Sequence, residues 1–360
     1  MIYRETGVHH TTYRTDMALF RVPLARWSVA GLLVVAVVIP FFATDYWFSA
    51  ILIPFLTFTI ATLGLNLMTG YAGQVSLGHA AFIAVGGYTA TILLIYDVPF
   101  LAAVVLGGLV AALVGLVFGI PSARIKGLYL AMATLAAQFV LPWAISRVVP
   151  LVVPTGLAVA GGDTVYPPRP NLFGLEIDSL FERYFVSLAI LVVMTVFAMN
   201  LVRTRVGRAW VAIRDHDVAA KILGVNITHY KLLAFAIGSF YAGVSGALMV
   251  FFYYGVAHVG EFNLDLSLKL LGAIIIGGLG SIIGSFFGTA FIILLPIFLN
   301  ISLTFLGNAA GFQVSSGTIA GIENIVFGAL VVVLLIVEPL GLAKFWQNVK
   351  DYFRLWPFSY

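Results

Sequence analysis

Cysteine is absent from this chain of 360 residues, and charged side chains make up only 9% of it. Without cysteine the chain forms neither a disulfide nor a thiolate metal site. Soluble domains carry roughly 25% charged residues, whereas 61% of this chain is hydrophobic. Water cannot cover so much apolar surface, and we therefore expect lipid to cover much of it.

Several catalytic motifs are also missing. No Gly-Lys dipeptide occurs, which excludes a Walker A phosphate loop, and neither His-Glu-x-x-His nor Gly-x-Ser-x-Gly is present. The net charge of +4 comes from basic residues in short loops between apolar segments. This placement indicates membrane topology rather than nucleic-acid binding. Any ATP hydrolysis must come from another polypeptide.

Apolar segments follow one another through residues 27–340. A membrane span needs roughly 20 apolar residues, and ten segments approach or reach this length, counting one short piece. They are 27–43, 47–68, 78–96, 100–120, 128–148, 184–202, 232–254, 266–276, 282–301 and 322–337. The sequence therefore predicts an all-α, polytopic integral membrane protein of about ten transmembrane helices, including discontinuous or re-entrant segments.

Basic residues alternate with acidic loops along these spans. Lysine and arginine concentrate in residues 1–26, 124–126, 203–231 and 341–360, which ten spans place on one face. The positive-inside rule makes that face cytoplasmic. We expect cytoplasmic N- and C-terminal tails, a cytoplasmic loop at 203–231, and a proline-rich external loop at 150–183. No signal-peptide cleavage site is evident, so the first span is expected to remain.

Residues 64–82, GLNLMTGYAGQVSLGHAAF, place glycines and polar groups among apolar spans. Glycine costs about 1 kcal/mol in a helix interior, and Ser76 is a suitable N-cap for a new helix from Leu77. One interpretation is a broken helix that lines a translocation pathway and offers free N–H groups to a substrate carboxylate. The alternative is hydrogen bonding between packed helices, without substrate contact. The candidate pathway residues are Asn66, Gly70, Gly73, Gln74, Ser76, Gly78 and His79.

A second glycine-rich segment, Gly277–Gly284, also follows one apolar run and precedes another. Transporters often carry broken helices at corresponding places in two halves. The segment therefore favours an internal repeat, although glycine is common throughout this chain.

The loop at 203–231 contains a helix start-and-stop pattern. Asp215 and Asp217 precede the apolar positions of a short amphipathic helix, and Gly224 follows them. Such a helix either lies on lipid headgroups or docks a cytoplasmic partner. The candidate coupling residues are Arg208, Arg214, Asp215, Asp217, Ala219 and Gly224.

Three charged residues flank the short piece at 266–276. Asp265 and Lys269 are spaced i,i+4 and are expected to pair, with Glu261 nearby. They are candidates for an external gate, and a solvated helix end is the alternative. No span carries a ladder of buried acidic groups, which weighs against an ion-coupled secondary carrier. No intramembrane catalytic constellation is evident either, which weighs against a lipid-acting enzyme.

Three segments resemble one known family. They are residues 64–82, residues 207–224 (GRAWVAIRDHDVAAKILG) and residues 272–284 (GAIIIGGLGSIIG). Together they are similar to the permease subunits of branched-chain amino acid ABC importers, specifically the longer, M-type member of the permease pair. The similarity spans about residues 30–340.

The resemblance implies a transport subunit in a bacterial inner membrane, without its own ATPase site. A second, homologous permease, two cytoplasmic ATPases that bind ATP and Mg²⁺, and a periplasmic solute-binding protein would complete the importer. The resemblance also favours docking as the role of residues 214–224. It leaves the solute open among hydrophobic amino acids, urea or short amides, and aromatic carboxylates, and no cofactor or metal is expected in this chain.

Overall fold

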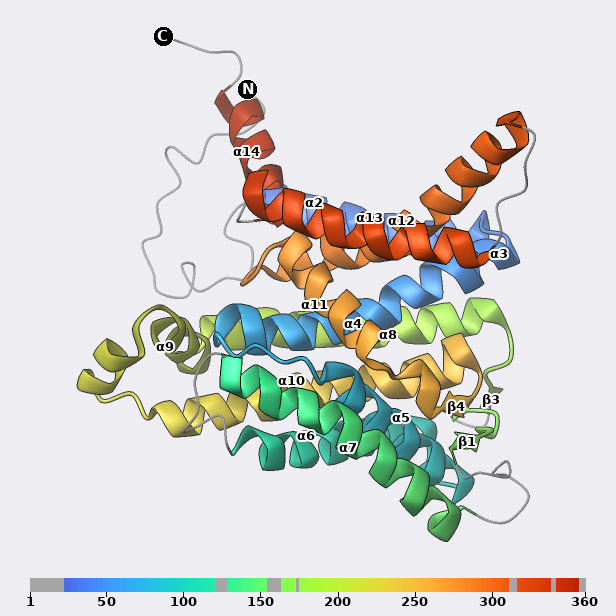
Figure 1. Cartoon of the computed structure of the whole chain (residues 1–360), viewed down its shortest axis with the longest axis horizontal. Coiled ribbons are helices and arrows are strands. Elements are labelled where there is room, and N and C mark those ends of the chain that lie inside the picture. The colour runs from blue at the N-terminus through green and yellow to red at the C-terminus, as the bar shows by residue number, and fades with distance from the viewer. Residues whose placement is uncertain are drawn as a thin grey trace.

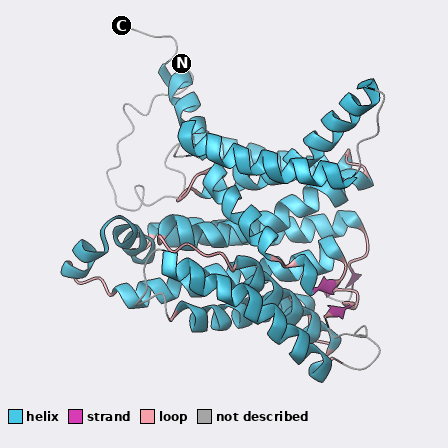
Figure 2. Cartoon of the chain, in the orientation of Figure 1, coloured by secondary structure: helices cyan, strands magenta, loops and turns pink. Residues whose placement is uncertain are grey.

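The computed structural model describes residues 23–120, 128–153, 163–172, 175–310, 316–337 and 341–355 (Figure 1). Helices make up most of these residues, and the strands are short and lie together at one end (Figure 2). The all-α membrane fold expected from the sequence is confirmed.

Each of the ten predicted segments corresponds to a helix. These helices are α2 (Pro23–Val38), α4 (Ile53–Asn66), α5 (His79–Ile95), α6 (Phe100–Gly119), α7 (Leu128–Val152), α8 (Leu180–Arg203), α10 (Ile227–Leu248), α11 (Leu264–Gly277), α12 (Ile282–Ala310) and α13 (Ser316–Val337). Shorter turns extend three of them. The turn η1 (Ile39–Phe41) follows α2. Helix α4 is preceded by α3 (Asp45–Trp47) and the π-helical turn η2 (Phe48–Leu52), and it is followed by the π-helical turn η3 (Leu67–Tyr71). The π-helical turn η5 (Met249–Tyr254) follows α10.

Six helical stretches within the described residues are long and apolar enough to cross a bilayer. They are Asp45–Tyr71, Phe100–Gly119, Tyr129–Val152, Leu180–Arg203, Ile227–Tyr254 and Ile282–Phe305. Trp27–Phe41 and His79–Ile95 are shorter apolar helices. Helix α9 (Arg205–Ile222) lies at one end of this bundle. The strands β1 (Thr164–Val165), β3 (Leu175–Glu176) and β4 (Ala257–His258) lie at the other end (Figure 1). The basic loop and the proline-rich loop are therefore at opposite ends, as their charges predicted.

Helix α10 is at the centre of the bundle and packs against α4, α5 and α6. Small residues allow these helices to approach closely, which is how membrane helices gain van der Waals contact. A β-carbon on Gly86 would overlap the backbone of Gly243, and one on Gly246 would overlap the carbonyl of Ile83. The α5–α10 contact therefore depends on glycine at these positions.

Gly86→Ala is expected to destabilise the chain by about 1–3 kcal/mol, because the added methyl group forces two backbones apart. Gly31→Ala is the matched control: Gly31 is also within an apolar helix, and a β-carbon added there would meet no described atom within 4 Å. It should be neutral or stabilising by up to about 1 kcal/mol through helix propensity. Thermal unfolding in detergent measures both, and equal melting temperatures would contradict the close approach.

Within the described residues, four short strands form two antiparallel pairs at the end opposite α9. Strand β1 (Thr164–Val165) pairs with β4 (Ala257–His258), and β2 (Asn171–Leu172) pairs with β3 (Leu175–Glu176). The Tyr88 hydroxyl of α5 donates to the carbonyls of Asp163 and Ala257. This side chain ties the strands to the bundle.

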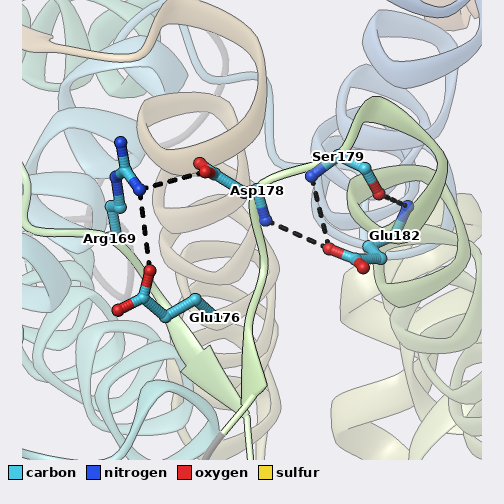
Figure 3. Close-up of polar contacts among 5 residues, drawn as sticks. All are labelled: Arg169, Glu176, Asp178, Ser179 and Glu182. Carbon is cyan, nitrogen blue, oxygen red and sulfur yellow. Dashed lines mark hydrogen bonds and ion pairs between the residues drawn. The ribbon is translucent and has the colours of Figure 1, made fainter.

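Helix α8 begins with a capping box that the sequence analysis did not identify. The Ser179 hydroxyl accepts from the Glu182 N–H at 3.2 Å, and the Glu182 carboxylate accepts from the Ser179 N–H at 3.3 Å (Figure 3). Beside it, the Arg169 guanidinium lies 3.0 Å from Asp178 and 3.6 Å from Glu176 (Figure 3). These ion pairs are exposed and add little stability.

The C-terminal segment contains a helix where the sequence predicted a tail. Helix α14 (Gly341–Leu355) contacts α11 and α12, and the Trp346 ring lies 6.1 Å from that of Phe287. Residues 341–355 therefore pack partly on the bundle.

Candidate translocation and coupling site

The predicted helix break is confirmed. The helix that begins at Asp45 ends at Tyr71, residues 72–78 are not helical, and α5 starts at His79. Gly73 has a φ of +69°, a left-handed conformation that glycine adopts at little cost. The chain thus leaves one helix and enters the next through a short non-helical segment.

The predicted N-cap at Ser76 is wrong. The N-cap residue of α5 is Gly78, and the Ser76 hydroxyl accepts from the Gly78 N–H at 3.4 Å. The Leu77 N–H donates to the Thr134 hydroxyl of α7 at 3.0 Å. This bond to a neighbouring helix holds Leu77 outside α5 and delays the start of the helix by two residues.

Side chains from two other helices occupy the N–H groups at the start of α5. The Ala80 N–H donates to the Ser267 hydroxyl of α11 at 2.9 Å, and the Ala81 N–H donates to Gln138 Oε1 of α7 at 3.1 Å. Ser267 also donates to Gln138 Oε1 at 2.9 Å, and Gln138 Nε2 donates to the Phe262 carbonyl at 2.7 Å. In this conformation the donors expected for a substrate carboxylate are bonded within the protein.

Asn66 joins the two glycine-rich segments. Its side-chain nitrogen donates to the Ser281 carbonyl at 2.7 Å and to the Ser285 hydroxyl at 2.9 Å. Its side-chain oxygen accepts from the Gly280 N–H at 2.9 Å. A β-carbon on Gly70 would overlap the Gly280 nitrogen, so the segments are in direct contact. The prediction that the two segments belong to an internal sequence repeat stays a prediction.

The other predicted polar residues are buried at the same break. His79 Nε2 bonds to the Ala61 carbonyl at 3.0 Å, and its Nδ1 has no hydrogen-bond partner within the described residues. The Gln74 backbone carbonyl accepts from the Thr69 hydroxyl at 3.0 Å, and the Gln74 side chain is 1% exposed.

Asn66→Leu should lower the free energy of unfolding by about 2–5 kcal/mol, because it removes three hydrogen bonds and leaves buried backbone groups unpaired. Ser285→Ala removes one of these bonds and should cost about 1 kcal/mol. Thermal unfolding of the solubilised chain gives the comparison. If Asn66 only lined the pathway, Asn66→Leu would abolish transport and leave the free energy of unfolding unchanged.

Helix α9 combines a buried part and an exposed part. Trp210 is fully buried, and its indole N–H donates to the Tyr230 carbonyl at 2.8 Å. His216 has a non-helical conformation (φ −151°, ψ 92°) and divides the helix. Beyond this kink, the side chains of Val218, Ile222 and Leu223 are 66%, 81% and 81% exposed.

The second part of α9 matches the predicted short helix, although α9 as a whole is longer than expected. Ala219 is exposed on it, Lys221 is in its last turn, and Gly224 follows with a φ of +86°. The predicted apolar face is therefore present, and within the part of the chain that the structure describes it is exposed.

Arg214 connects α9 to the helix break. Its Nη1 donates to the Gly70 carbonyl at 2.8 Å, and its Nε lies 2.9 Å from Asp215 Oδ1. A β-carbon on Gly73 would lie 3.0 Å from Arg214 Cγ. The guanidinium thus binds a carbonyl at the C-terminal end of a helix, where a positive charge is favourable.

The predicted Asp265–Lys269 pair is confirmed at 3.1 Å in the first turns of α11. Glu261 is in the turn η6 (Val259–Glu261) that precedes this helix. The gate role of these three residues stays a prediction.

Three residues at the α5 start were missed by the sequence analysis: Thr134, Gln138 and Ser267. Each is an isolated polar residue in an apolar segment and is buried. A polar residue in a membrane span requires a hydrogen-bond partner inside the protein. This requirement could have identified the three residues from the sequence. The sequence does not show that all three converge on one helix terminus.

Comparisons with known proteins agree with the fold. The model of a family described as "Branched-chain amino acid transport system / permease component" matches residues 47–336. The chain is 32% identical over 280 residues to the high-affinity branched-chain amino acid transport system permease protein LivM of Salmonella typhimurium, covering 70% of this chain and 63% of that protein. The LivM protein of Escherichia coli is 31% identical over 282 residues, with the same coverage.

A more distant relative matches over a greater length. The probable LivM protein of Methanocaldococcus jannaschii is 23% identical over 330 residues, covering 82% of this chain and 92% of that protein. The chain spans less than two thirds of the length of the two bacterial relatives. No solved structure matches.

Proposed function

Because this chain belongs to the family of permease components of branched-chain amino acid transport systems, we propose that it forms half of the translocation pathway of an ATP-driven importer for hydrophobic amino acids. It is a membrane protein and a transport subunit. The hydrogen bond from Arg214 to the Gly70 carbonyl is the observation that supports the mechanistic part of this proposal. This bond joins α9, an exposed helix at one end of the bundle, to the broken helix inside the bundle.

The proposed importer needs other chains. A second, homologous permease completes the pathway, a periplasmic solute-binding protein delivers the solute, and two ATPases supply the energy after binding ATP and Mg²⁺. We place the α9 end of the bundle and both chain termini on the cytoplasmic side of a bacterial inner membrane, as the basic loops indicate.

Among the candidate pathway residues, Gly73 and Gln74 keep the proposed lining role, whereas Gly70 packs against Gly280. Asn66 has all its hydrogen-bonding groups engaged by the second glycine-rich segment, which supports a packing role for it. Ser76, Gly78 and His79 hold the start of α5. Opening the pathway would require a change in these contacts.

Reconstitution tests the proposal as a whole. Liposomes containing both permeases and the ATPases, supplied with the solute-binding protein, should accumulate L-leucine only with ATP inside. Uptake driven by an ion gradient without the ATPases would instead indicate a secondary carrier. Uptake of urea or an aromatic carboxylate, but not leucine, would reassign the solute.

The apolar face of α9 is the proposed ATPase contact. Ile222→Glu places a charge on it and should weaken ATPase binding by about 30-fold or more, the effect of losing a central contact worth about 2 kcal/mol. Co-purification and ATPase titration measure this loss. Thr228→Glu, an exposed change outside this face, is the control, and undiminished binding by Ile222→Glu would refute the assignment.

Arg214→Met should separate docking from transport. The exposed face of α9 is unchanged, but the hydrogen bond to the Gly70 carbonyl is lost, so we expect ATP hydrolysis to continue while uptake falls about tenfold. Arg205→Met removes the same charge from an exposed position on α9 and should leave uptake near normal. The readout is the ratio of solute transported to ATP hydrolysed. An unchanged ratio in Arg214→Met would argue against a coupling role for the hydrogen bond between Arg214 and the Gly70 carbonyl.

A further inference from the structure

A polar cleft of about 240 Å³ lies between the helix break and α9. Its walls come from Gly73 and Gln74 in the break, from the start of α7, from the α9 kink and from the second turn of α10. A volume of this size holds a small organic solute rather than a single water molecule.

Gln74 is the unusual residue of this cleft. Its side chain is 1% exposed, yet neither its amide oxygen nor its amide nitrogen has a hydrogen-bond partner within the described residues. Buried amides are almost always hydrogen-bonded, because leaving one unpaired is costly. Gln74 lines the cleft, but its amide atoms are themselves buried. A rotation of the side chain toward the cleft would let the unpaired amide bind a polar ligand there.

The charges around Gln74 have both signs. Arg214 and Lys231 supply cationic groups, Asp215 and Asp217 supply carboxylates, and all four line the same cleft. Lys231 is only 7% exposed. Leu130 and Ile213 add an apolar wall. A molecule that carries an ammonium, a carboxylate and a short apolar group would complement this lining.

We propose that this cleft is a binding site for a zwitterionic α-amino acid, formed jointly by the helix break and the α9 kink. The inference rests on the proposed function and extends it, because it places a solute site against the element proposed to contact the ATPase. A ligand in the cleft would touch Gln74 on one side and residues 213–217 on the other. Its binding would then shift the equilibrium between arrangements of these two segments.

The absence of native cysteine makes a direct test possible. His216 is exposed and lines the cleft, so His216→Cys provides a reporter for alkylation by N-ethylmaleimide in the complete importer in nanodiscs. L-Leucine should slow this alkylation at least threefold, whereas 4-methylpentanoate and 3-methylbutylamine, which each lack one charge, should not. Thr228→Cys, exposed and outside the cleft, should react equally with and without leucine.

Two conditions identify where the solute comes from. Protection without ATP or binding protein would show that the cleft takes up solute directly from the α9 side. Protection only with ATP and loaded binding protein would show that it receives solute through the pathway. Both outcomes support the site, and the lack of protection in both conditions overturns it.

Gln74→Leu, in the same reporter background, should raise the half-protective leucine concentration at least tenfold. This variant removes an amide that has no hydrogen-bond partner within the described residues, so we expect its melting temperature to be unchanged or higher. Binding of radiolabelled L-leucine under the same conditions provides a second readout. Equal leucine dependence with and without Gln74 would overturn the proposal.

The same importer variant reconstituted in liposomes, where uptake can be measured, separates the two levels of inference. ATP-driven leucine uptake without protection at the cleft would leave the importer intact and remove the site. Protection by leucine in a complex that does not transport leucine would keep the site and remove the proposed function.

Discussion

The structure depends on satisfying backbone polar groups where the chain leaves its helices inside the bundle. Hydrocarbon offers no hydrogen-bond partners, so irregular backbone at membrane depth must be buried in protein or must face water. Residue Leu77 of the break and the first turn of α5 meet this demand with side chains from other helices. Thr134 and Gln138 from α7 and Ser267 from α11 accept from the N–H groups of Leu77, Ala81 and Ala80, respectively. The helix break is therefore a property of three elements together.

The same constraint explains why the two glycine-rich segments lie in contact. The Gly280 N–H and the Ser281 carbonyl both lie outside α11 and α12 and are satisfied by the amide of Asn66. An amide suits this position because it presents a donor and an acceptor side by side. Close approach of Gly70 to Gly280 makes the arrangement possible, so each segment supports the irregular backbone of the other.

Sequence patterns predicted the elements well and their contacts poorly. Hydrophobic length gave ten segments that all correspond to helices, and the charge pattern separated the two ends of the bundle. The start of α5 was misplaced by two residues, because a hydroxyl from α7 competes for the Leu77 N–H. Local sequence contains no information on that partner, which lies 57 residues away. The kink at His216 is a backbone conformation that no sequence pattern indicated. The hydrogen bond from Arg214 to the Gly70 carbonyl joins residues 144 positions apart, so local sequence did not predict it either.

Helix α9 has two parts with different roles in the fold. The first part is fixed to the bundle by the buried Trp210 and its bond to the Tyr230 carbonyl, whereas the second part exposes Ile222 and Leu223. The non-helical residue His216 separates them, so a force on the second part does not pass along one continuous helix. Arg214 lies just before the kink and holds the Gly70 carbonyl. A displacement of the exposed part can therefore reach the broken helix through the Arg214 side chain.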